Sequence, residues 1–299
     1  MNIAKPKRPD VKGFFEKRTF SVQYVVSDPG SKKCAIIDPV LDFEEKSGST
    51  ATASVDAILS YVEAERLEPV WILETHLHAD HLTAAAHLKR KTGASTVIGE
   101  RTVDIQKFWK DIFNWPDFPA DGSQWDHLIR DGESLRLGES EIEARLSPGH
   151  TPASVTYVVG DAIFVHDTLF MPDYGAARTD FPGGDARALW RSIQDILAFP
   201  DDFRVFTGHD YLPHGRRPLW ESTIGEQKAN NIHVANKTEA EFVALRQARD
   251  KTLTMPKLIL PALQVNIRGG LLPEPESNGR RYLKIPLDAF PGAIWDEQH

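Results

Sequence analysis

Cysteine is almost absent from this sequence, because Cys34 is the only one among 299 residues. A single thiol excludes an internal disulfide. Cys34 lies in the apolar run Cys34-Ala35-Ile36-Ile37. That setting indicates a buried structural thiol rather than a nucleophile.

Long apolar runs and an excess of positive charge are also missing. No segment approaches the length of a membrane span, and residues 1–9 lack the apolar stretch of a signal peptide. The net charge is −8 and there is no long basic run. We therefore expect a cytoplasmic protein that binds neither nucleic acid nor membranes. Assembly into a homodimer is possible.

The composition is that of an ordinary globular protein, with 41% hydrophobic and 26% charged residues. The chain is long enough for one or two domains. Period and turn signals predict strands at 19–26, 34–40, 69–75 and 95–98. They predict helices at about 51–67, with Ser49 or Thr50 as its cap, and at 82–91 and up to Trp109. This alternation is typical of an α/β layer structure.

The middle of the chain has a different pattern. Residues 131–146 and 154–165 each predict a hairpin, and residues 205–207 predict a strand. Residues 181–185 predict a loop ending in an N-cap at Asp185, followed by a helix at about 188–197, and a further helix is predicted at 240–252. Two strand-rich groups with helices indicate two sheets packed face to face. We expect a leader at 1–17, a core at 18–215, and a C-terminal helical extension at 216–299 that packs on the core.

The densest cluster of chemically active groups is Thr75-His76-Leu77-His78-Ala79-Asp80-His81, with three imidazoles and a carboxylate. An apolar strand precedes it and an Ala-rich helix follows, so it lies on a strand-to-helix loop. At the end of an extended segment, His76 and His78 project to the same side and can approach one metal ion. Asp80 and His81 then face a neighbouring position.

Three later strand ends carry groups of the same kind. His150 follows Ser147-Pro148-Gly149, Asp167 precedes Thr168-Leu169-Phe170, and His209 lies in Gly208-His209-Asp210. Functional residues gather on such loops, and repeated placement at strand ends favours a shared site. Taken singly, each residue has hydrogen bonding in a turn as an alternative role.

These motifs together resemble the metallo-β-lactamase superfamily, over about residues 18 to 215. The resemblance implies an αββα sandwich with two mixed sheets flanked by helices. In its dinuclear hydrolases, of which glyoxalase II is the most similar kind, one ion would be held by His76, His78, His150 and Asp167. The other would be held by Asp80, His81, His209 and the bridging Asp167.

A narrower resemblance, to persulfide dioxygenases of the ethylmalonic-encephalopathy type, rests on residues 167–170, 177–185, 264–270 and 281–286. It implies one Fe(II) held by His76, His150 and Asp167, the two-histidine, one-carboxylate set of non-haem iron oxygenases. His78, Asp80, His81 and His209 would then surround these ligands. The substrates would be glutathione persulfide and O2, the products sulfite and glutathione.

Arg178 is the candidate for contacting a glutathione carboxylate, with a surface salt bridge as the alternative. A dinuclear zinc hydrolase of the glyoxalase II or lactonase type and a non-catalytic metal-binding protein remain alternatives to the dioxygenase. His166 departs from the family pattern, where glycine is expected before the aspartate. Strand alternation predicts that the His166 side chain points away from Asp167. We treat the remaining histidines as ordinary: His87, His127, His214, His233 and His299.

Overall fold

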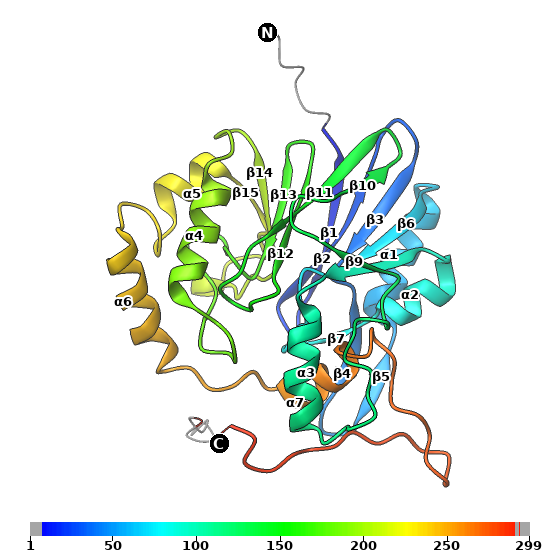
Figure 1. The fold of residues 1–299 in the computed structure, drawn as a ribbon. Coiled ribbons are helices and arrows are strands. Elements are labelled where there is room, and N and C mark those ends of the chain that lie inside the picture. Colours follow the sequence, from blue (N-terminus) through cyan, green and yellow to red (C-terminus); the bar gives the residue numbers. More distant parts are fainter. Residues whose placement is uncertain (1–7, 291–292, 294–299) are drawn as a thin grey trace.

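Two six-stranded sheets pack face to face in a computed structural model that describes residues 8–290 and residue 293 (Figure 1). The first sheet comprises, in spatial order, β1 (Asp10–Glu16), β2 (Ser21–Ser27), β3 (Lys33–Ile37), β6 (Glu68–Leu73), β8 (Ser95–Gly99) and β9 (His127–Ile129). The second comprises β10 (Ser134–Leu137), β11 (Ser140–Leu146), β12 (Val155–Val159), β13 (Ala162–His166), β14 (Arg204–Thr207) and β15 (Glu221–Thr223). Both sheets are mixed, because β3, β6, β8 and β9 pair in parallel, as do β13 and β14.

Helices cover the two outer faces (Figure 1). On the first sheet lie α1 (Ala53–Ala64), α2 (Ala85–Thr92), α3 (Thr102–Ile112) and α7 (Ile259–Asn266). On the second lie α4 (Ala186–Leu197), α5 (Ile224–Asn230) and α6 (Glu239–Asp250). A small sheet of β5 (Ser49–Ala51), β4 (Val40–Glu44) and β7 (Leu82–Thr83) completes the regular strands, and a short 3₁₀ helix spans Pro213–Gly215. The expected αββα sandwich is therefore confirmed.

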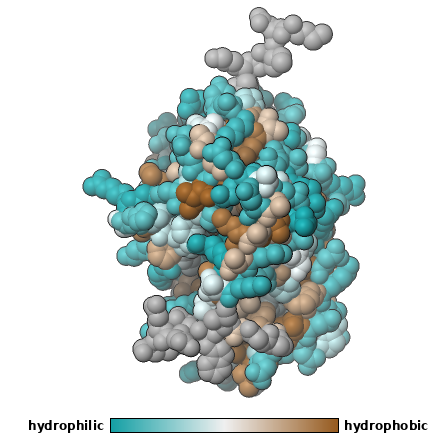
Figure 2. All heavy atoms as spheres, turned by 90° about the vertical axis from the view of Figure 1, so that its left-hand side faces the viewer, coloured by the Kyte–Doolittle hydropathy of each residue, from teal (hydrophilic) through white to brown (hydrophobic). Residues whose placement is uncertain are grey.

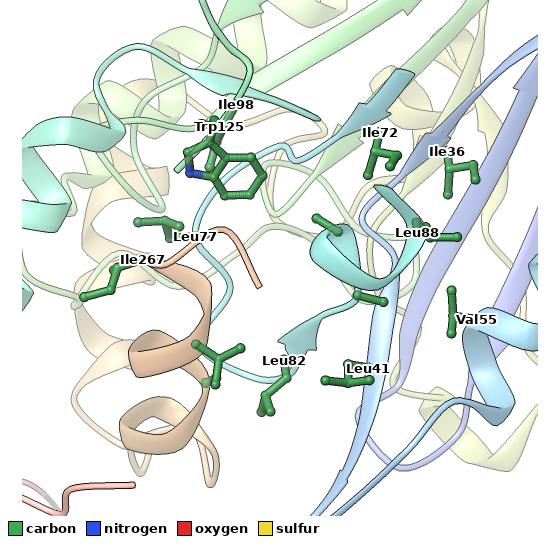
Figure 3. Packing of buried hydrophobic residues seen from close by; sticks show 14 of the residues in the cluster. Ile36, Leu41, Val55, Ile72, Leu77, Leu82, Leu88, Ile98, Trp125 and Ile267 are labelled. Carbon is green, nitrogen blue, oxygen red and sulfur yellow. The ribbon is translucent and has the colours of Figure 1, made fainter. Parts of the chain in front are cut away.

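Strand alternation explains these layers. Along β2, Tyr24 faces the core between the two sheets, whereas Val25 faces the core under the helices. Successive side chains of a strand point to opposite faces, so a fully buried strand feeds two cores at once. Figure 3 shows the core under α1, α2 and α7, to which residues from distant parts of the sequence contribute, among them Ile36, Val55 and Ile267.

The predicted leader contains an unpredicted strand. Residues 1–7 lie outside the described part of the chain, but β1 pairs antiparallel with β2 along its whole length, from Asp10 opposite Ser27 to Glu16 opposite Ser21. Among the described residues, no helix is both long and apolar enough to cross a membrane.

Other predicted elements differ in detail. The strand expected at 34–40 divides into β3 and β4, because Asp38 has a positive φ of 50° that turns the chain. Ser49 and Thr50 do not cap α1; they lie in β5, and the residue at the cap position is Thr52. In contrast, Asp185 caps α4 as expected, its carboxylate accepting a hydrogen bond from the Ala188 amide.

The region after residue 216 packs on both halves of the core. Phe242 of α6 lies in the cluster under α4, whereas Leu263 of α7 lies in the cluster with the first sheet. Residues 271–290 have no regular helix or strand and run along the surface. The helical extension thus packs on the core, and its boundary as a separate domain stays a prediction.

The buried thiol of Cys34 provides a test of this packing. Cys34 has no exposed surface, and burial raises its pKa to about 12, with Glu68 adding to the effect. Because only thiolate reacts, we expect an aromatic disulfide reagent at pH 8 to leave the native protein unmodified and to label one thiol per chain in guanidinium chloride. Cys34→Ala supplies the reagent blank. Rapid labelling of the native protein would show that β3 is not buried in this way.

Candidate metal centre

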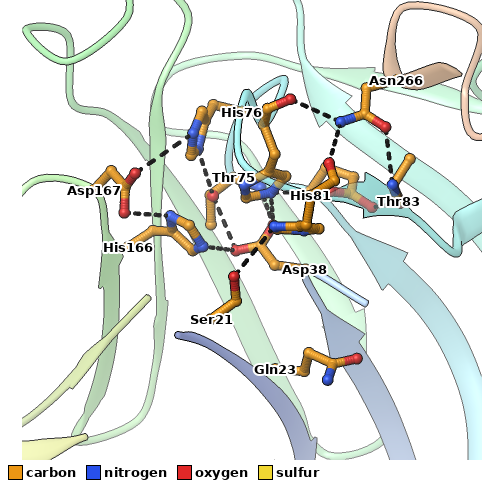
Figure 4. Close-up of polar contacts among 12 residues, drawn as sticks. Ser21, Gln23, Asp38, Thr75, His76, His81, Thr83, His166, Asp167 and Asn266 are labelled. Atoms are coloured by element: carbon orange, nitrogen blue, oxygen red, sulfur yellow. Dashed lines mark hydrogen bonds and ion pairs between the residues drawn. The ribbon is translucent and has the colours of Figure 1, made fainter. Parts of the chain in front are cut away.

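The loop between β6 and β7 and three other strand ends meet at one edge of the sandwich. Figure 4 shows part of this centre, with His76 and His81 of the loop near Asp167. The loop carries His76, His78, Asp80 and His81; His150 follows β11, Asp167 follows β13 and His209 follows β14. All of these side chains except Asp80 are buried. The structure therefore brings together every metal-ligand candidate that the sequence indicated.

Three of these residues form a compact group. One ligand atom each from His76, His150 and Asp167 lies within 4.8 Å of the others. The Asp167 Oδ2 atom is 3.4 Å from His150 Nε2 and 3.9 Å from His76 Nε2. Ligand atoms bound to one ion at about 2.1 Å are roughly 3–3.6 Å apart, so these separations are close to what one ion requires.

The outer nitrogens of the two histidines are held by protein oxygens. His150 Nδ1 donates to the Arg178 carbonyl oxygen at 2.8 Å, and His76 Nδ1 lies 3.1 Å from Thr75 Oγ1. Such contacts set the tautomer and the ring direction of a metal-bound histidine. They leave the Nε2 atoms of both rings facing Asp167.

The remaining candidates lie in further groups of the same kind. His78, Asp80 and His81 form one, and Asp167 and His209 join His166 in another; His78 also groups with His76 and His166, and with Asp38 and Glu74. His78 Nε2 contacts Asp38 Oδ1 at 3.0 Å, so its Nδ1 is the atom left toward the centre. Asp80 Oδ2 lies 3.0 Å from His81 Nδ1 and 3.6 Å from His209 Nε2.

The prediction that His166 points away from Asp167 is wrong. Pairing between β13 and β14 shifts register between Phe164 and His166, and His166 has a positive φ of 40°. A register shift of this kind redirects side chains, so simple alternation no longer holds. The ring is buried in the centre, and a Cβ atom on Gly208 would lie 2.6 Å from it. Gly208 therefore leaves the space that the imidazole fills.

Two buried carboxylates near the centre were missed from the sequence. Asp38 accepts hydrogen bonds from the Thr75 amide at 2.8 Å and the Thr75 hydroxyl at 2.9 Å, and it contacts His78 and His166. Glu74 contacts His78 Nε2 at 3.2 Å. Asp38 directly follows β3, which pairs in parallel with the strand before His76. The strand-end reasoning that found His150 would have found Asp38 as well.

The electrostatics of the centre favour a cation. Burial lowers the pKa of His76, His81 and His150, so these rings are neutral and can donate a lone pair to a metal. Burial alone would raise the pKa of Asp167, but the His209 and His166 imidazoles lower it below its ordinary value. Burial by itself would lower the pKa of His166. The neighbouring Asp38 and Asp167 carboxylates outweigh this effect and raise that pKa to about 9.

Several polar atoms in this buried centre have no hydrogen-bond partner in the protein. They are His76 Nε2, His78 Nδ1, His81 Nε2, both ring nitrogens of His166 and of His209, Asp167 Oδ1 and Glu74 Oε2. A buried polar atom without a partner costs about 1–3 kcal/mol. So many at one point fit a metal site, because bonds to an ion would satisfy them.

A cleft of about 1050 Å³ opens onto the centre at Asp80, His150, Asp167 and His209. Aromatic rings line it near the histidines, with Tyr211 stacked on His209 at 5.4 Å and Phe181 at 5.0 Å from His150 between ring centroids. Its cationic side chains are Arg18, Lys46, Arg178, Arg246, Arg249 and Lys257. Figure 2 shows the side of the molecule that carries α6, where hydrophobic patches are scattered over a largely hydrophilic surface.

Arg178 lies in this cleft, but its guanidinium is already engaged. It forms two 2.7 Å hydrogen bonds to the Asp180 carboxylate and a third to the Thr254 carbonyl oxygen. It also lies over the Phe181 ring at 4.9 Å. Only the N–H groups not used in these bonds can contact a substrate, so the predicted role in substrate binding stays a prediction.

The other histidines lie outside the centre. His127 pairs with Glu133, and His233 accepts a hydrogen bond from the Ala176 amide. His87 and His214 belong to none of the candidate metal groups among the described residues, and His299 lies outside that part of the chain.

Asn266, at the end of α7, fixes the backbone of the histidine loop. Its Nδ2 atom donates to the carbonyl oxygens of His78 and His81, both at 2.8 Å, and its Oδ1 atom accepts from the Thr83 amide. All three bonds are buried, so no water can replace them (Figure 4). The C-terminal helix therefore positions the loop that carries the candidate ligands.

Comparison with known proteins agrees with this geometry. The family model described as the metallo-beta-lactamase superfamily matches residues 17–209. The chain belongs to this superfamily. It is 63% identical to a "Beta-lactamase hydrolase-like protein" of Xylella fastidiosa over 96% of its own length, and it spans 67% of that relative.

The chain is also similar to proteins named as persulfide dioxygenases or as ETHE1. The chain is 32% identical to the human mitochondrial "Persulfide dioxygenase ETHE1" over 86% of its length and 87% of the relative's. The crystal structure of ETHE1 from Myxococcus xanthus matches with a TM-score of 0.70 and 29% identity, covering 88% of this chain and all of that one. The predicted resemblance to both the superfamily and the persulfide dioxygenases is confirmed.

Replacing Asn266 tests how this superfamily member holds its loop. Asn266→Ala leaves two buried carbonyl oxygens without donors, so we expect a loss of about 2–4 kcal/mol in the free energy of unfolding and weaker metal binding. Urea unfolding and metal titration measure these effects. Asn278→Ala, in an exposed position, should change stability by less than about 0.5 kcal/mol. Equal unfolding midpoints for both variants would contradict the role of Asn266.

Proposed function

We propose that this protein is a persulfide dioxygenase that uses Fe(II) and O2 to oxidise glutathione persulfide to sulfite and glutathione. The observation that carries the proposal is the group of His76, His150 and Asp167 at the inner end of the cleft. Two imidazoles and one carboxylate are the protein ligands of many non-haem Fe(II) oxygenases. Bound Fe(II) would supply the redox chemistry that joins O2 to the sulfur of the substrate.

The overall reaction is balanced by one water molecule. Both oxygen atoms of O2 end on the terminal sulfur of the persulfide, which is oxidised while O2 is reduced. Water then supplies the third oxygen of sulfite as the sulfur–sulfur bond breaks, and glutathione leaves as the thiol. No further oxidant or reductant is required.

The residues around the ligands hold the centre in one arrangement. The Arg178 carbonyl orients His150 and Thr75 orients His76, so the Nε2 atoms of both rings stay directed at Asp167. Fixed ligands lower the cost of reorganisation during a reaction. Phe181 and Tyr211 line the cleft beside these ligands and limit the access of water to the reacting sulfur.

The charges of the cleft suit a substrate with carboxylates far from its reacting sulfur. Glutathione has two carboxylates, and Arg249 and Lys46 lie along the same cleft as Arg178, whereas Lys257 there is paired with Glu45. Arg249 lies over the Tyr174 ring at 5.5 Å, which directs its guanidinium along the wall. Contacts between these cationic side chains and the glutathione carboxylates, remote from the sulfur, would position the persulfide for reaction.

A metal-dependent hydrolase is the second candidate. The groups that contain Asp80, His81 and His209 remain assembled beside the first triad, as a dinuclear zinc hydrolase of the glyoxalase II or lactonase type would need. The relative from Xylella fastidiosa carries the words "hydrolase-like" in its name, whereas the human relative is named as a persulfide dioxygenase. The predicted cytoplasmic location and homodimer stay predictions.

Metal content separates the two candidates. We expect protein purified without oxygen to carry close to one iron per chain, measured by plasma emission. His150→Ala and Asp167→Ala should lose this iron, because each removes one of three protein bonds to the ion. His209→Ala should keep it and turn over more slowly. Zinc in place of iron, or iron lost as completely from His209→Ala as from His150→Ala, would contradict the assignment.

Oxygen uptake tests the substrate. Iron-loaded wild type should consume O2 with glutathione persulfide and release sulfite, which a hydrolase would not do. Arg178→Ala should lose about 1–3 kcal/mol in kcat/KM, mainly through a higher KM, as expected when a charged hydrogen bond to substrate is removed.

Arg187 provides the matched control, because it lies exposed on α4 and outside the cleft. Arg187→Ala should leave kcat/KM unchanged. If Arg178→Ala lowers thermal stability and leaves KM unchanged, Arg178 has a structural role through its bonds to Asp180 and Thr254 and does not bind substrate. Absence of O2 uptake by the iron-loaded wild type would favour the hydrolase.

A further inference from the structure

The Arg178 carbonyl oxygen, which accepts the hydrogen bond from His150 Nδ1 at 2.8 Å, lies on an irregular segment of backbone. Residues 175–179 are neither helical nor part of a named strand, apart from an isolated bridge between Leu169 and Ala176. A functional side chain is held precisely only where the groups that orient it are themselves held. The contacts that fix this segment therefore bear on the direction of the His150 ring.

Two residues of α6 supply those contacts. Arg246 Nη1 donates to the Ala176 carbonyl oxygen at 2.8 Å. Asp250 Oδ2 accepts hydrogen bonds from the Thr179 amide at 2.9 Å and from the Thr179 hydroxyl at 3.0 Å. The backbone is thus held two residues before Arg178 and one residue after it.

Arg246 and Asp250 also form an ion pair with each other, four residues apart on the helix. Arg246 donates to Asp250 Oδ1 through both Nε and Nη2, and only 1% of Arg246 and 6% of Asp250 is exposed. All three guanidinium nitrogens therefore donate to protein oxygens, although Arg246 borders the cleft. Apolar residues often stabilise a fold as well as a buried ion pair does. What an apolar pair could not supply is the set of contacts to Ala176 and Thr179.

The backbone beside His150 is held by another helix. The Ser192 hydroxyl of α4 donates to the Pro148 carbonyl oxygen at 2.7 Å, and the Asp185 amide at the N-cap of α4 donates to the Gly149 carbonyl oxygen at 2.9 Å. The hydrogen bond from the His150 ring to its carbonyl acceptor thus joins a loop fixed by α4 to a segment fixed by α6. The direction of the ring depends on both anchors.

We propose that Arg246 and Asp250 are positioning residues for the metal centre. They hold the Arg178 carbonyl oxygen, which directs the His150 imidazole with its Nε2 atom toward Asp167. Loss of the groups that orient a metal-bound histidine typically lowers metal affinity or activity by about 10- to 100-fold. The inference rests on His150 as a metal ligand, which both the proposed dioxygenase and the alternative hydrolase require.

Paired substitutions separate this role from a general effect on folding. Arg246→Met with Asp250→Leu removes both charges together, so no buried charge is left unpaired, but it also removes both contacts with residues 176–179. Arg246→Met with Asp250→Asn removes the same charges and keeps a side-chain oxygen that can accept from Thr179. We call these the Leu variant and the Asn variant.

The matched control is a second pair that joins α4 to α6. Arg187 Nη1 lies 3.2 Å from Glu239 Oε1, and both side chains are exposed. Arg187→Met with Glu239→Gln therefore removes an ion pair between the same two helices without touching residues 176–179. We expect this control variant to match wild type in every measurement below.

Co(II) affinity of the full chain, measured by competition with a chelator, is the first readout. The Leu variant should bind Co(II) about 10- to 100-fold more weakly than wild type, with a shifted visible spectrum, because the ring of His150 is no longer held. The Asn variant should lie between the two. Urea unfolding of the metal-free proteins, measured in parallel, reports the structural effect alone, which by itself would leave the Co(II) spectrum unchanged.

The second readout needs no metal. In metal-free protein labelled with 15N-histidine, the Nδ1 proton of the buried His150 ring should give a magnetic resonance signal, since its hydrogen bond protects it from exchange. The signal is identified by its absence from His150→Ala. It should disappear in the Leu variant and persist in the Asn variant.

Wild-type Co(II) affinity and an intact ring-proton signal in the Leu variant would overturn the proposal and leave the ion pair with a packing role. If the Leu variant does not fold, the Asn variant decides, because it still lacks the contact to Ala176: affinity equal to wild type would refute the role. Zinc in place of iron and no O2 uptake would refute the dioxygenase and keep these positioning residues. O2 uptake by iron-loaded wild type, with unchanged Co(II) affinity in the Leu variant, would do the reverse.

Discussion

The buried carboxylate of Asp38 is the constraint on which the rest of the centre depends. It accepts hydrogen bonds from the Thr75 amide and hydroxyl and contacts both His78 and His166. It therefore connects the histidine loop to the end of β13. A buried anion with several donors has little freedom to move. The rings around it therefore take fixed directions before any ion binds.

Sequence patterns predicted the layers and most of the candidate ligands for a physical reason. Buried strands and amphipathic helices bear a local signature, and side chains at the ends of neighbouring strands, such as His150 and His209, necessarily gather at one edge. Asp38 lies beside His78 through the parallel pairing of β3 and β6, although its position at a strand end was a signal that could have found it. Glu74 lies only four residues before His78, but its local pattern does not show that its carboxylate is buried.

Backbone detail accounts for the other errors. The direction of His166 is set by a register shift and a positive φ, together with the space at Gly208 and the distant carboxylate of Asp38. The direction of the His166 ring thus depends on tertiary contacts that a single sequence does not encode locally. The role of Arg178 in binding substrate stays a prediction; the structure adds that Asp180 and Thr254 hold part of its guanidinium.

The position of Asn266 has a consequence for biosynthesis. The histidine loop is translated early, but the side chain that satisfies its carbonyl oxygens lies 185 residues after His81. A nascent chain that has not yet emerged beyond α7 exposes this loop in an unfinished form, although all of its imidazoles are already present. The loop therefore reaches its final backbone arrangement only after α7 has been synthesised and has packed against it.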